Sequence, residues 1–180
     1  MKKFARITGT GSYLPPKIVT NFDLEKTLNT SDDWITARTG IKERRIVTDE
    51  NTCDLALEAS LNALSMAELN PEDIDLIILA TTTPDKIFPA TATILQDRLG
   101  ASCPAFDLQA VCAGFVFALT TAQQYIENGS AKNILVVGSE TMSKIVDWND
   151  RSTAILFADG AGAVVLSADN TTGIKHSKLF

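Results

Sequence analysis

The chain has 180 residues, 45% of them hydrophobic, and a formal net charge of −6 at pH 7. A chain of this length and composition can bury the core of one globular domain. The negative charge argues against a nucleic-acid partner, because phosphate binding needs a concentrated basic face. No apolar run approaches the roughly 20 residues of a membrane span, and the first six residues lack the apolar core of a signal peptide. We therefore expect a cytoplasmic protein that binds neither nucleic acid nor membrane.

The three cysteines are Cys53, Cys103 and Cys112, and they form no Cys-x-x-Cys pair. An odd number without such a pair predicts neither a disulfide framework nor a zinc site, and a reducing cytosol is the simplest compartment. The single histidine, His176, excludes a histidine-rich metal site. We expect no metal and no cofactor.

Residues 4–8 predict a first strand, and GTGS follows at residues 9–12. A Gly-x-Gly after a strand occurs in dinucleotide-binding loops, but the prolines at positions 15 and 16 would break the helix that such a loop needs. The glycines are therefore interpreted as a turn. Asn21 is a candidate N-cap for a short helix over residues 22–28.

Residues 31–40 predict a helix that Ser31 caps and Gly40 ends. Trp34 and Arg38 lie four residues apart and so share a face of this helix. Two interpretations of the pair stay open. One is a packed indole beside a surface charge, and the other is a stacking plane with a cation, suited to a nucleotide.

Residues 41–47 look like a strand and carry the run Glu43-Arg44-Arg45, whose charge is interpreted as a solvated face. Residues 52–69 predict a helix. Its packed face is expected to contain Leu55, Ala59, Ala63 and Met66. Residues 74–81 lack clean alternation, which indicates a parallel strand covered on both faces. A further helix is predicted over residues 90–99, ending at Gly100.

Residues 103–119 begin as a buried strand and end as a buried helix, with Cys112 at the junction. Helical spacing after the cysteine predicts one packed face, made of Val116, Leu119, Ala122 and Ile126. The helix stops at Gly129. A thiol at a helix start is favoured as the thiolate, which is the nucleophile. The alternative, an inert core cysteine, stays open on these grounds.

Residues 133–138 predict another buried strand, and residues 139–151 are polar and irregular. Two further strands, at 155–157 and 163–166, are expected to flank a turn at DGAG, residues 159–162. A last strand over 174–179 would run off the end of the chain, which is odd for a natural terminus. The alternation of strands and helices predicts one α/β domain over residues 1–180, mostly parallel, with right-handed crossovers.

The run DLQAVCAGF at residues 107–115 closely resembles the active-site segment of β-ketoacyl-acyl carrier protein synthase III, a condensing enzyme of the thiolase superfamily. Further segments resemble the same family, in the family's order. They are GTGSYLP (9–15), TSDDW (30–34), RTGI (38–41), ATT (80–82), FP (88–89), VVGSE (136–140), DR (150–151) and DGAGA (159–163). The resemblance implies the N-terminal half of a thiolase fold. The expected sheet has five mostly parallel strands covered by helices, in the order 3-2-1-4-5 with one antiparallel strand.

The resemblance also implies an acyltransferase that starts fatty acid synthesis, a part of lipid metabolism. Cys112 would take an acetyl or other short acyl group from acyl-CoA and condense it with malonyl-acyl carrier protein. Trp34 and Arg151 match positions that sandwich the CoA adenine, and Thr30 and Arg38 match positions that hold other parts of the nucleotide. Phe88 matches a residue that lines the acyl pocket of the neighbouring subunit. The family dimerises through the strand before the cysteine, here residues 105–108.

One departure from the family is large. Its members are nearly twice as long, and their catalytic histidine and asparagine lie in a second half that this chain lacks; His176 matches neither. We therefore expect incomplete activity from this chain alone, with a homodimer or a second chain as partner. Two alternatives stay open: a related condensing enzyme with another acyl starter, or a non-catalytic partner subunit of the same fold.

Overall fold

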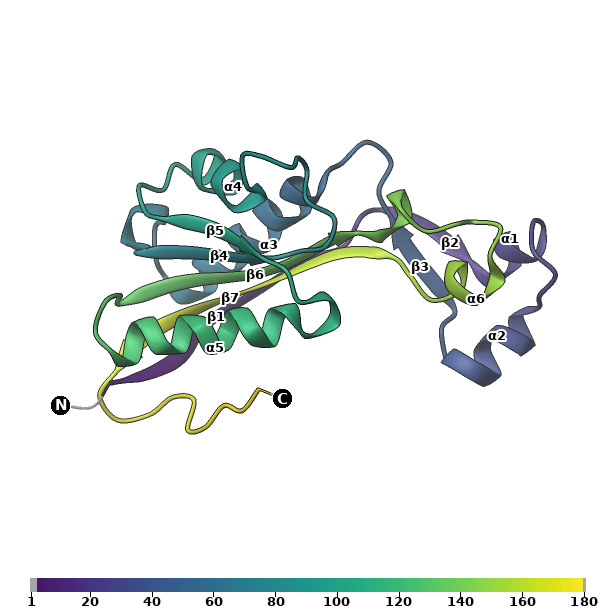
Figure 1. Cartoon of the computed structure of the whole chain (residues 1–180). Helices are drawn as coiled ribbons and strands as arrows, with labels where there is room; N and C mark the ends of the chain where they lie inside the picture. The colour runs from purple at the N-terminus through teal and green to yellow at the C-terminus, as the bar shows by residue number, and fades with distance from the viewer. Residues whose placement is uncertain (1–2, 180) are drawn as a thin grey trace.

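The structure, a computed structural model, describes residues 3–179 and is built around one five-stranded sheet (Figure 1). The strands lie in the order β1-β7-β6-β4-β5. Their bounds are Phe4–Tyr13 (β1), Leu76–Ala80 (β4), Ala105–Leu108 (β5), Asn133–Thr141 (β6) and Asp159–Asp169 (β7). β4 pairs in parallel with β5 and β6, whereas β7 pairs antiparallel with both β1 and β6. The prediction of five strands with one antiparallel strand is confirmed.

The predicted strand order 3-2-1-4-5 is wrong. Counted along the chain, the strands of the sheet lie in the order 3-2-4-5-1, because the first strand pairs with the last instead of lying in the centre. β1 and β5 are therefore the two edges. β5, predicted to be buried, is half-buried at every residue because it has a neighbour on one side only.

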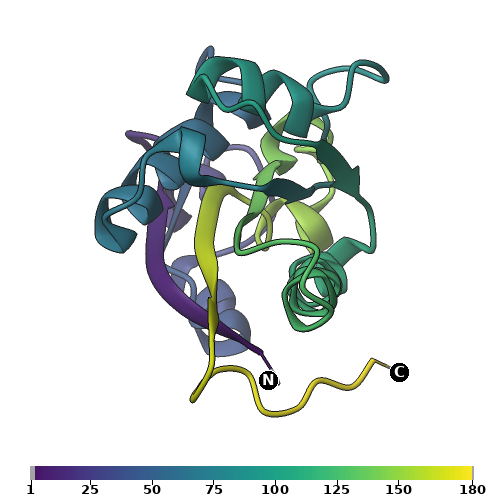
Figure 2. The ribbon, with the colours of Figure 1, turned by 90° about the vertical axis from the view of Figure 1, so that its left-hand side faces the viewer.

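Helices cover both faces of the sheet (Figure 2). α3 (Thr52–Ala67) and α4 (Thr91–Leu99) pack on one face, and α5 (Gly114–Glu127) packs on the other. Along β4, Ile77 and Leu79 point toward α3 and α4, whereas Ile78 points toward α5. Every residue of β4 is buried, as its continuous apolar run predicted.

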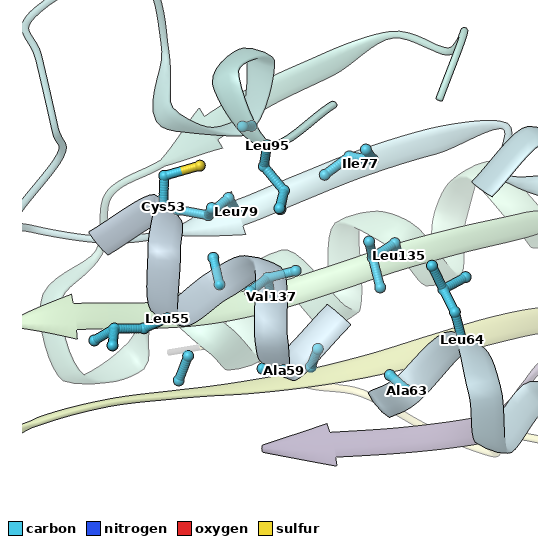
Figure 3. Close-up of a cluster of buried hydrophobic side chains, with 14 of the residues drawn as sticks. Cys53, Leu55, Ala59, Ala63, Leu64, Ile77, Leu79, Leu95, Leu135 and Val137 are labelled. Carbon is cyan, nitrogen blue, oxygen red and sulfur yellow. The ribbon is translucent and has the colours of Figure 1, made fainter. Parts of the chain in front are cut away.

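α3 forms the largest contact with the sheet, and Figure 3 shows its side chains against those of β4 and β6. Leu55, Ala59 and Ala63 are fully buried, as predicted. Met66 is 63% exposed, so its placement in the core was wrong. The packed face continues instead at Ala67, four residues after Ala63. The Met66 sulfur accepts a hydrogen bond from the Thr10 hydroxyl at the surface, at 3.3 Å.

Both glycine-rich segments lie within strands, so the two predicted turns are wrong. Gly9 and Gly11 belong to β1, and Gly160 and Gly162 belong to β7. The glycines of β1 permit close packing of α3: a Cβ at Gly11 would lie 2.1 Å from the Ala59 carbonyl oxygen. The two glycines of β1 therefore serve packing between helix and sheet.

The last predicted strands also differ from the structure. Residues 155–157 and 174–179 form no strand, and β7 is a single strand between β1 and β6. The C-terminal segment touches β1 through a backbone hydrogen bond from Ile174 N to Ala5 O at 2.9 Å, and Lys175 Nζ lies 4.8 Å from the centre of the Phe4 ring. Local alternation could not reveal this, because β7 is defined by pairing with strands far away in sequence.

A small module extends beyond the sheet (Figure 1, right). It contains the two-stranded sheet of β2 (Lys17–Thr20) and β3 (Glu43–Ile46), with α1 (Asn21–Glu25), α2 (Asp32–Thr39) and α6 (Arg151–Ala154). Its own core is a separate cluster of buried side chains: Leu24, Leu28, Ile35, Ala154 and Ile155. Short 3-10 turns complete the chain: η1 (Pro71–Asp73), η2 (Val111–Ala113) and η3 (Met142–Lys144).

Both ends of α2 lie where the sequence predicted them. The Ser31 hydroxyl accepts a hydrogen bond from Trp34 N at 3.1 Å, and Gly40 ends the helix with φ 72°. The prediction for α1 was wrong by one residue, since Thr20 is the N-cap, and the helix ends early, at Glu25. Asn21 is instead buried inside the small module.

The predicted solvated face of β3 is also wrong at its centre. Arg44 is only 2% exposed and is among the largest fully buried side chains. Strand alternation explains the difference, because Glu43 and Arg45 point the other way and form an ion pair at 3.4 Å.

Candidate active site

Cys112 lies in the single 3-10 turn η2, between the end of β5 and the start of α5. This confirms that the cysteine directly precedes the helix. Gly129, with φ 84°, follows the end of α5, as predicted. Ala122 and Ile126 are buried as predicted, but Val116 is 51% exposed and so does not belong to the packed face.

The three cysteines differ in exposure. Cys112 is exposed, Cys103 is half-buried and Cys53 is buried. Burial raises the pKa of Cys53 to about 11 and also raises the pKa of Cys103, so both thiols stay protonated near neutral pH. The interpretation of Cys112 as an inert core cysteine is therefore wrong, and it is the accessible thiol among the described residues.

The residue before the cysteine has an unusual backbone. Val111 has φ 49°, in the left-handed region that β-branched residues rarely adopt. Its side chain is 69% exposed, so burial does not compensate for this conformation. Strained residues of this kind are concentrated at functional sites. Here the strain lies in the turn that presents the Cys112 thiol.

Two cavities meet at Cys112. One, of about 240 Å³, lies toward the sheet and is lined by Ala80, Val111, Cys112, Phe115, Gly138, Ser139, Glu140 and Gly160. The other, of about 180 Å³, is lined by Thr82, Val111, Cys112, Glu140, Met142 and Phe157. Both lie where β4, β5 and β6 reach their carboxyl ends, the usual position of ligands in open α/β sheets.

Glu140 is the acidic residue that lines both cavities. Its carboxylate accepts hydrogen bonds from Thr82 N at 2.7 Å and from the Thr82 hydroxyl at 2.9 Å, and a further one from the Thr83 hydroxyl. These bonds fix the loop after β4 against β6. Sequence reasoning did not single out Glu140. An acidic residue near the carboxyl end of a parallel strand, three residues after the apolar run at 134–137, was the signal that could have found it.

A second group of predicted residues lies in the small module. The Arg38 guanidinium carbon is 4.1 Å from the centre of the Trp34 ring, and that of Arg151 is 4.4 Å from it. We call these three residues the indole cluster. They come from α2 and α6, which are far apart in sequence, and the Arg151 side chain also donates to Asn29 O at 2.9 Å. Both distances fit cation–π contacts.

Thr30 and Phe88 complete the predicted residues. The Thr30 hydroxyl oxygen is buried without a hydrogen-bond partner among the described residues, although it lies next to Asn29, which holds Arg151. An unpaired buried hydroxyl is the kind of group that a ligand can satisfy. Phe88 is 82% exposed, in the loop between β4 and α4, and it lines neither cavity at Cys112.

The structure thus groups Trp34, Arg38 and Arg151, with Thr30 one residue from the Arg151 contact, and it places Cys112 in a separate group. Figure 1 shows that α5 begins at the end of the sheet nearer to α2 and α6. Within residues 3–179, no helix has the length and apolarity to cross a membrane, and no group of side chains has the composition of a metal site.

Comparison with known proteins matches the part of the chain that contains Cys112 to a known family. Residues 106–180, which include Cys112, match the family model of 3-oxoacyl-[acyl-carrier-protein (ACP)] synthase III. The whole chain is 71% identical to a β-ketoacyl-[acyl-carrier-protein] synthase III of Vesicomyosocius okutanii subsp. Calyptogena okutanii over 180 residues. The chain is therefore a homologue of the N-terminal half of β-ketoacyl-acyl carrier protein synthase III. It spans 57% of that relative, so a little over half of a family member's length is present.

Solved structures show the same family fold. The synthase III of Aquifex aeolicus is 54% identical, with a TM-score of 0.91 over 92% of this chain and 54% of that one. The priming β-ketosynthase of the R1128 polyketide pathway is 38% identical, with the same TM-score over 94% of this chain and 52% of that one. The predicted thiolase-like α/β fold is confirmed.

Proposed function

We propose that this synthase III chain forms the acyl-accepting part of a condensing enzyme that starts fatty acid synthesis. The observation that carries the proposal is Cys112, an exposed thiol in a strained turn between two cavities. The same chain carries the indole cluster, with two cations on one aromatic ring. A nucleophile and an aromatic, basic site in one chain suit a substrate that joins an acyl thioester to a nucleotide, as acyl-CoA does. We treat residues 1–180 as one thiolase-like unit.

In the first step, the thiolate of Cys112 attacks the carbonyl carbon of an acyl-CoA thioester. A new C–S bond forms to the protein, the C–S bond to CoA breaks, and the CoA thiolate leaves and takes up a proton. In this proposal the backbone N–H of Cys112, in the turn before α5, donates to the carbonyl oxygen and stabilises the charge that develops there in the transition state.

The indole cluster binds the nucleotide end of CoA. A purine between the Trp34 and Arg151 planes needs about 7 Å, since each stacked contact takes about 3.5 Å. Arg151 lies 4.4 Å from the indole centre and therefore has to swing away when the base enters. Arg38 contributes positive charge for a phosphate, and the unpaired Thr30 hydroxyl contributes a hydrogen bond.

In the second step, malonyl-acyl carrier protein loses carbon dioxide, and the resulting carbanion attacks the acyl-Cys112 carbonyl. A C–C bond forms, the C–S bond breaks, and the thiolate is regenerated. The donors that stabilise this carbanion come from the part of the family's length that this chain does not span. We propose that the protein is cytoplasmic, uses no cofactor besides its CoA substrate, and pairs as a homodimer through β5. Phe88 would then line the acyl pocket of the neighbouring subunit.

The test is intact-mass spectrometry of the chain before and after acetyl-CoA, with Cys112→Ala beside it and Cys103→Ala as the matched control. We expect one acetyl increment in the wild type and in Cys103→Ala, and none in Cys112→Ala. An increment that persists in Cys112→Ala contradicts the proposal. No increment in any variant would favour a non-catalytic partner subunit of the same fold.

A second candidate is a condensing enzyme with a different acyl starter. The observation behind this candidate is the similarity to the R1128 priming β-ketosynthase, which has the same TM-score as the Aquifex aeolicus synthase III but a lower identity, 38% against 54%. Parallel reactions with acetyl-CoA and longer acyl-CoA donors separate the two, since the preferred starter gives the faster acylation of Cys112.

A further inference from the structure

The small module contains a buried cation without an acidic partner. Arg44 is 2% exposed, and its guanidinium reaches two elements on either side of β3. Its Nε and one terminal nitrogen both donate to Ile155 O, at 3.1 and 2.6 Å. The other terminal nitrogen donates to the Asn21 side-chain oxygen at 2.5 Å. Burial lowers the pKa of Arg44, and all of these acceptors are neutral.

Each contact of Arg44 connects it to one of the two helices that supply the indole cluster, α2 or α6. Ile155 is the C-cap of α6, the helix that starts at Arg151. Asn21 donates in turn to the Asp32 carboxylate at 2.7 Å and to Ile41 O at 2.8 Å. Asp32 is the first residue of α2, the helix that carries Trp34 and Arg38. One guanidinium therefore connects the two helices whose side chains meet at the indole.

Local interactions do not explain this connection. α2 and α6 are separated by more than a hundred residues, and no ion pair joins them in the described part of the chain. The other contacts between their regions are the indole contacts, the Arg151–Asn29 bond and the small apolar cluster around Ile35 and Ile155. A buried charge costs free energy unless its hydrogen bonds are met. A planar fork with fixed donors also sets geometry more strictly than a flexible ammonium group.

We propose that Arg44 is a positioning residue for nucleotide binding. It holds α2 and α6 at the separation at which Trp34 and Arg151 stack on the two faces of one bound base. The proposal rests on the function proposed above, because it needs a ligand with a nucleotide end. Arg44 itself is buried and touches no substrate. Its effect is therefore confined to donors that carry the nucleotide.

The experiment measures the rate of Cys112 acetylation by two donors, acetyl-CoA and acetyl-pantetheine, which lacks the nucleotide. The variants are Arg44→Lys, which keeps the charge but loses the fork, and Asn21→Ala, which removes the connection to α2 and the bond to Ile41 O but leaves both Arg44–Ile155 bonds in place. Arg45→Lys is the matched control, one residue away on the outer face of β3. Calorimetry of CoA binding and circular dichroism accompany each variant.

We expect Arg44→Lys to lower the acetyl-CoA rate about tenfold or more, since small displacements have large effects in aligned sites. The acetyl-pantetheine rate should stay within about twofold of the wild type, because no nucleotide has to be held. Asn21→Ala should shift the ratio of the two rates in the same direction, and Arg45→Lys should leave it unchanged. A variant that is partly unfolded lowers both rates together, so the ratio still reports positioning.

Equal ratios in the wild type, Arg44→Lys and Asn21→Ala would overturn the proposal while leaving the proposed function intact. A wild type that neither reacts with acetyl-CoA nor binds CoA would instead overturn the proposed function, and the positioning role with it. If the wild type binds CoA without reacting, the same comparison is made on CoA affinity. An unchanged affinity in Arg44→Lys then contradicts the proposal.

Discussion

Gly11 tests the packing of α3 on β1 most sharply. A Cβ added there would lie 2.1 Å from the Ala59 carbonyl oxygen and 2.4 Å from Ala63 N. Both atoms are helix backbone, so no side chain can rotate out of the way. The Ala59 oxygen would have to retreat by about 1.3 Å to reach the 3.4 Å at which ordinary contact begins.

Such a shift separates a whole helix from the sheet. α3 supplies Leu55, Ala59 and Ala63 to the core, all fully buried. Moving it opens gaps beside each of them. Overpacking costs about 1–3 kcal/mol in typical cores, and this site lies at the upper end because rigid backbone takes the strain. We expect Gly11→Ala to lower the free energy of unfolding by about 3 kcal/mol.

Gly162→Ala is the matched control. It lies in β7, and the nearest heavy atom to its added Cβ is Gly11 O at 4.0 Å. Glycine is unfavourable inside a strand by about 0.5–1 kcal/mol, so this change should leave stability equal or slightly higher. Urea unfolding followed by fluorescence and circular dichroism gives both values, provided that the slope is unchanged. A Gly11→Ala variant as stable as Gly162→Ala would refute the reasoning.

Four further outcomes are expected. Val111→Gly should raise the free energy of unfolding by about 0.5–1 kcal/mol, because the left-handed penalty exceeds the entropy cost of glycine; a less stable variant in urea would contradict the strain. Iodoacetamide at pH 8 should label Cys112 before the two less exposed thiols in peptide maps, and early labelling of Cys53 would contradict their burial. Burial raises the pKa of Cys53 from 9.0 to about 11, so the folded state favours the neutral thiol. Stability in urea should therefore fall between pH 9 and 11, and Cys53→Ala should lose less over that range. Asp159→Ala should destabilise by about 3 kcal/mol in urea, since it leaves the buried Val47 N–H and the half-buried Ser143 N–H and hydroxyl unpaired, and a neutral effect would contradict this role of the carboxylate.

Local pattern was enough to predict much of the fold. β4 was predicted from its continuous apolar run, and α2 from its serine cap and terminal glycine. Pairing between distant strands was not accessible in this way. Gly11 and Gly162 lie in segments with the composition of turns, yet they belong to the paired strands β1 and β7. At Gly11 the reason is packing, because a Cβ there would collide with the backbone of α3. Turn and packing glycines have the same local signature.

The site also divides into features that local pattern predicts and features that depend on tertiary structure. The position of Cys112 followed from helical spacing, but its exposure depends on the strained turn at Val111, which no spacing predicts. Trp34 and Arg38 followed from a shared helix face, whereas Arg151 joins them through tertiary structure. Arg44 was misread because a charged residue on a short strand is usually solvated. Its burial depends on acceptors that come from elsewhere in the chain.

The most direct measurement of acyl transfer to Cys112 is peptide mapping after brief exposure to acetyl-CoA. The tryptic peptide between Arg98 and Lys132 contains both Cys103 and Cys112, so fragmentation has to place the acetyl group. We predict a single acetyl group on Cys112, bound as a thioester that hydroxylamine removes. Acetylation of Cys103 or Cys53 instead, or an acetyl group that resists hydroxylamine, would contradict the assignment of Cys112 as the acyl acceptor.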